Sequence, residues 1–82
     1  MSYFVYILYS PIDNRFYVGQ TQDIKVRLLR HNSGLEASTA PYIPWELKLV
    51  IQKSTRSEAM ILEKKIKNLN RVKLLRFIKK YS

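Results

Sequence analysis

Apolar and polar positions alternate in short blocks along the first third of the chain. Apolar and aromatic residues fill positions 3–9, which predicts a strand covered on both faces and therefore central in its sheet. Positions 10–14 contain Pro11, Asp13 and Asn14, residues that favour a turn. Alternation resumes over positions 15–20, so the two runs predict a β-hairpin.

The pattern then changes to a helical period. Thr21 or Asp23 can cap a helix that runs to about Asn32, with Gly34 placed to stop it. The segment 35–44 contains serine, threonine and two prolines and predicts an irregular loop.

Within this first helix, Ile24 and Leu28 form the apolar stripe that would lie on the sheet. At about 100° per residue, Arg27 and His31 fall on the border of that stripe. We therefore expect both side chains to point along the sheet surface and not into bulk water.

Strict alternation over 45–53 predicts an edge strand with one covered face. Its apolar positions are odd-numbered: Trp45, Leu47, Leu49 and Ile51.

Thr55 and Glu58 then form a capping box, so a helix begins at Arg56. A second helical pattern covers 71–81, after a bend near Asn70. The buried stripe of the earlier helix contains Ala59, Leu62, Ile66 and Leu69.

Glu63 lies at the border of that stripe. A carboxylate there is half desolvated, so it needs a cation or a hydrogen-bond donor as a partner. Two interpretations remain open: a functional carboxylate, or a glutamate that pairs with a nearby lysine. Gly19, in the second strand, also has two interpretations. It either ends the strand or marks a place where another group approaches the backbone closely.

Together these elements predict an α+β fold, a three-stranded antiparallel sheet flanked by helices in the order β-β-α-β-α-α. With 82 residues, the chain has room for a single domain, 1–82, with one core. It has no cysteine, no run long enough to span a membrane and no signal-peptide pattern. We therefore expect a cytoplasmic protein.

The charge of the chain indicates what kind of partner it binds. The formal net charge is +9, and no acidic residue follows Glu63. A basic domain of this kind favours nucleic acid over the alternative of a solvated helical face, because unbalanced charge raises self-repulsion. The basic residues of this region are Lys64, Lys65, Lys67, Arg71, Lys73, Arg76, Lys79 and Lys80.

Candidate chemistry comes from two separate helices and the hairpin between them. The first helix brings Arg27 and His31, the later one Glu63, and the hairpin Tyr6 and Tyr17. A carboxylate, a cation, an imidazole and phenols suffice for metal-assisted phosphodiester hydrolysis if they converge. A single carboxylate favours Mg²⁺ held largely by water and substrate.

The spacing of these residues resembles the GIY-YIG nuclease domain. Val5-Tyr6 is followed by Tyr17-Val18-Gly19, with Arg27 ten residues after the second tyrosine and His31 four beyond it. The length and the basic C-terminal part resemble the small stand-alone UPF0213 proteins.

The resemblance implies a role for each site residue. Tyr6 and Tyr17 match the tyrosines that bind or deprotonate the attacking water and contact the scissile phosphate. Arg27 matches the arginine that stabilises charge on that phosphate, and Glu63 matches the metal ligand. His31 matches a residue that assists proton transfer, so we assign the general base jointly to Tyr6 and His31.

Departures from the family pattern are also visible. Phe4 replaces the first glycine, Gln20 stands where some members have a lysine, and Leu75 and Ile78 occupy the region of a C-terminal asparagine that many members carry. Asn70 lies near that region. The predicted nucleic-acid contacts are Gly19, Gln20, Lys64, Lys67, Arg71, Lys73 and Arg76.

The sequence therefore predicts an endonuclease that depends on Mg²⁺ or Mn²⁺ and nicks structured or damaged DNA without sequence specificity. The alternatives are a non-catalytic module that binds DNA or RNA, and a subunit whose protein partner supplies specificity.

Overall fold

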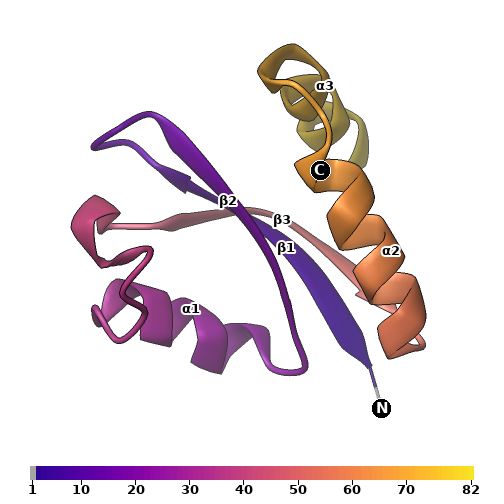
Figure 1. Cartoon of the computed structure of the whole chain (residues 1–82), viewed down its shortest axis with the longest axis horizontal. Helices are drawn as coiled ribbons and strands as arrows, with labels where there is room; N and C mark the ends of the chain where they lie inside the picture. Colours follow the sequence, from indigo (N-terminus) through magenta and orange to yellow (C-terminus); the bar gives the residue numbers. More distant parts are fainter. Residues whose placement is uncertain (1) are drawn as a thin grey trace.

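A computed structural model describes residues 2–82, and its centre is a three-stranded antiparallel sheet with the strand order β2-β1-β3. The strands are β1 (Tyr3–Ser10), β2 (Arg15–Thr21) and β3 (Glu46–Lys53). Helix α1 (Ile24–Asn32) covers one side of the sheet, and α2 (Arg56–Lys67) and α3 (Arg71–Tyr81) lie on the other (Figure 1). The predicted fold class and element order are confirmed.

Both faces of β1 are buried, as its continuous apolar run predicts. Val5 and Ile7 pack with Ala59 and Ile66 of α2 on one face. On the opposite face, Tyr6 and Leu8 form a second cluster with Trp45. The two clusters are the two layers of the core, one beneath α2 and α3 and the other beneath α1.

The prediction that β3 has only one covered face is wrong. Ile7 pairs with Leu49, whereas the next residue, Leu8, pairs with Leu47, so Lys48 is an extra residue in the strand. Such a bulge reverses the alternation, because one residue no longer has a partner opposite it. Leu49 and Ile51 lie on a covered face, as predicted, and pack in the cluster beneath α2.

The residues on the other side of the bulge change faces. Trp45 is buried in the α1 cluster, and Leu47, opposite Leu8, is turned to the same side but remains exposed. Val50, predicted to be on the open face, also packs into the α1 cluster. Both faces of this edge strand are therefore covered.

The segment between α1 and β3 is more ordered than its composition predicts. It contains the short 3₁₀ helix η1 (Ala40–Tyr42). Asn32 holds its far end: the side-chain amide accepts from the Trp45 N–H at 2.7 Å and donates to the Trp45 carbonyl at 3.1 Å. The indole of Trp45 in turn donates to the Thr39 carbonyl at 2.9 Å. These bonds fix the loop against the end of α1.

Side-chain caps fix where the helices begin. Asp23 accepts from the Val26 N–H, and Thr55 accepts from the Glu58 N–H, each at 3.1 Å. The Thr55 cap was predicted, and of the two candidates for the first helix, Thr21 and Asp23, the cap is Asp23. Asn70 caps α3 by accepting from the Lys73 N–H at 2.9 Å, so its side chain has a structural role. Within residues 2–82, every helix is too short or too polar to cross a membrane.

Candidate active site

Three of the predicted site residues form an aromatic cluster on the α1 side of the sheet. Tyr6 pairs with Gly19 and Leu8 with Tyr17, so Tyr6 and Tyr17 share a face of the hairpin. Helix α1 places His31 over them. The ring centroids of Tyr17 and His31 are 5.0 Å apart, and those of Tyr6 and His31 are 5.8 Å apart.

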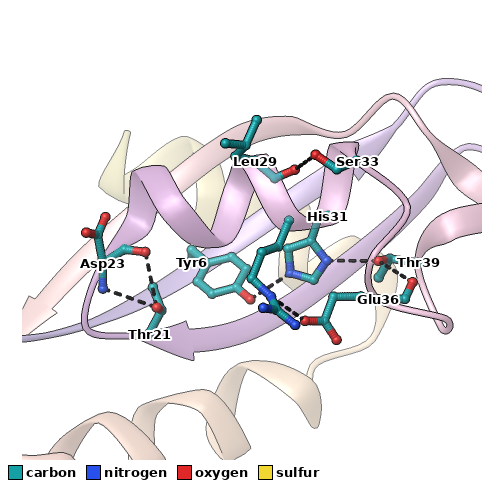
Figure 2. A network of polar contacts seen from close by, with 9 residues as sticks. Tyr6, Thr21, Asp23, Leu29, His31, Ser33, Glu36 and Thr39 are labelled. Atoms are coloured by element: carbon teal, nitrogen blue, oxygen red, sulfur yellow. Dashed lines mark hydrogen bonds and ion pairs between the residues drawn. The ribbon is translucent and has the colours of Figure 1, made fainter.

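A buried hydrogen bond joins two members of this cluster. The Tyr6 hydroxyl lies 2.9 Å from His31 Nε2, and each residue is only 1% exposed (Figure 2). His31 was predicted at the border of the apolar stripe and directed away from bulk water, and it is fully buried. Because neither residue faces bulk solvent, the half-buried Tyr17 is the tyrosine that a substrate can meet directly.

Burial also sets the protonation of this pair. Loss of solvation, reinforced by the neighbouring Tyr17, raises the pKa of the Tyr6 hydroxyl above its ordinary value, against the lowering effect of Arg27. Burial lowers the pKa of His31, and Arg27 and Arg30 lower it further, against the opposing effect of Glu36. Both groups are therefore neutral at neutral pH, and His31 is able to accept a proton.

Gly19 provides the space that Tyr6 occupies. A Cβ atom at this position would lie 2.6 Å from the Tyr6 hydroxyl oxygen and 2.7 Å from Cζ. The close approach anticipated from the sequence is therefore real, and what approaches is the Tyr6 phenol. Gly19 is itself buried, which leaves little of it for the predicted contact with nucleic acid.

Arg27 is the half-buried cation of the cluster. It lies on α1 one turn before His31, and its charge lowers the pKa of the Tyr6 hydroxyl. Across residues 2–82, no carboxylate forms an ion pair with Arg27. An arginine near a cleft without an acidic partner is suited to bind a phosphate.

Glu63 reaches this region from the opposite side of the sheet. Gln20 pairs with Val5, so its side chain faces α2, and its amide donates to Glu63 Oε1 at 2.8 Å. Lys67 forms an ion pair with Glu63 Oε2 at 2.9 Å. The charge of Glu63 still raises the pKa of Tyr6. Gln20 therefore connects Glu63 to the edge strand β2, and the aromatic cluster lies on the opposite face of the sheet.

One of the two interpretations of Glu63 describes the structure directly, because the glutamate pairs with Lys67. A functional role of this carboxylate stays a prediction. The Glu63 side chain is 18% exposed, so it is partly desolvated and accessible at once.

The donor set fits a metal ion held by one protein carboxylate. Each oxygen of Glu63 accepts one hydrogen bond and keeps a further lone pair. Residues 2–82 contain no group of three or more acidic, histidine or cysteine side chains that could hold a metal. Water and substrate phosphate would have to supply the other ligands, which is usual for Mg²⁺.

A cavity of about 490 Å³ opens at the same edge of the sheet. Gln20 and Arg27 line it, and so does Arg56, the first residue of α2. Arg56 was not among the predicted contacts, although its place directly after the capping Thr55 could have indicated that it projects from a helix end. The two arginines make this cavity suited to a phosphate-bearing strand.

The other predicted basic contacts have different surroundings. Lys64, Lys73 and Arg76 are exposed, whereas Lys67 is engaged with Glu63. Arg71 donates to the Asn14 carbonyl and side chain at 3.0 and 2.6 Å, which ties α3 to the hairpin turn.

Thr39 is a further residue of the cluster that the sequence did not indicate. It is 1% exposed, and its hydroxyl lies 2.9 Å from His31 Nδ1. A threonine in a loop rich in serine, alanine and proline carries no pattern that marks it as buried.

A hairpin that carries two tyrosines, an arginine and a histidine on the next helix, and a glutamate at the edge strand together define the class of GIY-YIG catalytic domains. The model of that family, described as the GIY-YIG catalytic domain, matches residues 2–76. The chain therefore belongs to the GIY-YIG family, whose members are nucleases that generally depend on a divalent metal.

The relatives narrow this assignment to the UPF0213 proteins. The chain is 38% identical to a UPF0213 protein of Staphylococcus aureus strain Mu3, over 95% of each chain, and equally to UPF0213 protein SAV0488 of strain Mu50. It also resembles the solution NMR structure of UPF0213 protein BH0048 from Bacillus halodurans. That similarity has a TM-score of 0.64 and 32% identity, and covers 96% of this chain and 84% of the other.

Proposed function

We propose that this protein is an endonuclease that uses Mg²⁺ or Mn²⁺ to hydrolyse phosphodiester bonds in DNA, one strand at a time. The observation that supports the proposal is that Gln20 of β2 hydrogen-bonds Glu63 and lines the same cavity as Arg27, which lies on the helix that carries His31. Structured or damaged DNA is the preferred substrate, because the chain has no second recognition unit within residues 2–82 to read a base sequence.

In this mechanism, Tyr17 and Arg27 hold the scissile phosphate, and the guanidinium stabilises the charge that builds on its oxygens. Tyr6 is 1% exposed in the free protein, so this step requires that DNA binding admits the attacking water to its hydroxyl. Tyr6 then takes the proton of that water while its own proton passes to His31 Nε2. The new bond forms between the water oxygen and phosphorus, the bond to the leaving sugar oxygen breaks, and that oxygen takes a proton from solvent water while His31 later returns its extra proton to solvent.

The coupling to His31 is needed because burial holds the Tyr6 pKa high, so the phenolate is not available at neutral pH. A metal ion at Glu63 would supply Lewis-acid stabilisation of the phosphate and leaving oxygen.

A second function, nucleic-acid binding without cleavage, is favoured by the state of Glu63. Gln20 and Lys67 already bond both of its oxygens. If these contacts persist when DNA is bound, the carboxylate is less available to a metal and the protein would bind without cutting.

Purified protein incubated with labelled branched and linear DNA and with Mg²⁺ or Mn²⁺ decides between the two. We expect nicks that disappear in Glu63→Gln and Arg27→Ala, whereas Ser38→Ala, an exposed loop change, cuts normally. Cleavage that survives both substitutions, or no cleavage with either metal, would contradict the nuclease. Binding without cleavage would then favour the second function.

A further inference from the structure

Three hydrogen bonds connect Tyr6 to the loop that follows α1. The Tyr6 hydroxyl lies 2.9 Å from His31 Nε2, and His31 Nδ1 lies 2.9 Å from the Thr39 hydroxyl. That hydroxyl lies 3.3 Å from the Glu36 carbonyl oxygen and can donate to it. Figure 2 shows the side chains in line, with His31 between the phenol and the threonine.

The direction of donation along these three hydrogen bonds follows because a buried hydroxyl needs an acceptor. Tyr6 is 1% exposed, and within residues 2–82 His31 Nε2 is the acceptor available to its O–H. Nε2 must then be unprotonated, so a neutral ring carries its proton on Nδ1. That N–H donates to the Thr39 oxygen, and the Thr39 proton goes to the Glu36 carbonyl.

Donation in the opposite direction, from Thr39 towards Tyr6, leaves a polar group without a hydrogen-bond partner. If Thr39 donated to Nδ1, the Nε2–H would point at the Tyr6 oxygen, and the Tyr6 proton would have no acceptor in its buried position. A buried donor without a partner is strongly disfavoured.

We propose that Thr39 is a positioning residue, whose hydroxyl holds His31 in the tautomer with the proton on Nδ1 and leaves Nε2 free to accept the proton of Tyr6. The tautomer stands on the hydrogen bonds alone. Its consequence for catalysis rests on the proposed function.

The surroundings of Thr39 hold this hydroxyl in place. The Thr39 N–H donates to the Glu36 carbonyl at 3.1 Å, and its own carbonyl accepts from the Trp45 indole. An ion pair of 2.9 Å between Arg30 and the Glu36 side chain ties the same loop back to α1. The Thr39 hydroxyl is thus fixed relative to the helix that carries His31.

Nitrogen NMR tests the tautomer directly, because the chain has a single histidine and its ring signals need no assignment. In ¹⁵N-labelled wild type we expect the shift of a protonated nitrogen at Nδ1 and of an unprotonated one at Nε2. A proton on Nε2 in the wild type would overturn the proposal.

Three variants then isolate the hydroxyl. Thr39→Val keeps the shape but removes the acceptor, so we expect the proton to leave Nδ1 or to divide between the two nitrogens. Thr39→Ser should restore the wild-type signals, and Ser38→Ala, the exposed neighbouring hydroxyl, should leave them unchanged. A wild-type ring spectrum in folded Thr39→Val would overturn the role of Thr39, and fluorescence of the single tryptophan verifies folding.

Cleavage provides the second readout. Thr39→Val should lower kcat by roughly tenfold or more with little change in KM, as when a histidine loses its orienting partner, and Thr39→Ser should recover it. An unchanged kcat in a variant whose tautomer has shifted would overturn the catalytic part. If the wild type shows the expected tautomer but cuts no DNA, the proposed function fails while the assignment of the tautomer stands.

Discussion

At the scale of single residues, burial separates the two tyrosines that the family motif treats alike. Tyr6 is enclosed between Gly19 and His31, whereas Tyr17 keeps part of its surface open. Alternation along the hairpin predicted that both lie in the sheet, but not which one would be enclosed. That depends on the position of α1 over the strands, which a hydrophobic pattern does not specify.

The buried His31 makes stability depend on pH. Its folded pKa lies below the ordinary value of 6.5, so the unfolded chain binds a proton more readily than the folded one. The free energy of unfolding should therefore be full above pH 7 and fall as the pH drops through 6.5, by at most about 1.4 kcal/mol per pH unit.

Urea unfolding between pH 7.5 and about 5.5 measures this slope, since no other histidine titrates there. His31→Gln, which has no titratable group, should show a flatter profile. An equal slope in the variant would assign the effect to other groups.

Gly19→Ala tests the space beneath Tyr6. The new Cβ would overlap the Tyr6 hydroxyl, so we expect destabilisation of roughly 1–3 kcal/mol, as for overpacking in a core. The displaced phenol should also change the ring signals of His31.

Gly34→Ala is the matched control. A Cβ atom added at Gly34 would lie 3.8 Å from the nearest side-chain atom, which is ordinary contact. The φ of +77° nevertheless strains an alanine there by about 1–2 kcal/mol. Both variants lose stability, and only the first should move the His31 signals. Unchanged His31 signals in Gly19→Ala would contradict the packing described for Tyr6.

At the scale of secondary structure, the elements were predictable because their signals are local. Asp23 and Thr55 identify helix starts through hydrogen bonds to residues three positions ahead. The bulge at Lys48 was not predictable, because it depends on which residues of β1 lie opposite β3. Trp45 consequently belongs to the layer beneath α1, against the simple alternation.

The same limit applies to the contact between α2 and β2. A helical wheel places Glu63 at the edge of the buried stripe, which was confirmed, but the partner Gln20 is forty-three positions away. Only the packing of the helix across the edge strand brings the two together. The sequence therefore identified the carboxylate but not the group that holds it.

Lys67 and Gln20 should compete with a metal for Glu63. Lys67→Ala removes a cation that binds one carboxylate oxygen, so cleavage should reach half its maximum at a lower Mg²⁺ concentration than in wild type. Lys65→Ala, an exposed change on the same helix outside the predicted contacts, should leave that concentration unchanged. A higher Mg²⁺ requirement in Lys67→Ala would show instead that the lysine helps to hold the substrate.

At the scale of the whole molecule, the sequence gives the net charge but not where the basic side chains gather on the surface. The net charge of +9 indicates a polyanionic partner, and the excess of basic residues after Glu63 directs attention to the C-terminal helices. Arg71, however, is bonded to the hairpin turn. The cavity at the edge of β2 draws its arginines from two helices on opposite sides of the sheet, an arrangement that only the fold creates.

Arg56 is the residue that this arrangement adds to the predicted nucleic-acid contacts, and salt dependence tests it. If its guanidinium meets a phosphate, the slope of log K against log [salt] should become shallower by about one contact in Arg56→Ala. Lys79→Ala, an exposed charge near the end of α3, should change the slope less. Measuring both in a Glu63→Gln background keeps the DNA intact. An equal slope in the two variants would mean that the charge acts through the general field of the protein, and a larger effect of Lys79 would move the binding surface from the β2 edge to α3.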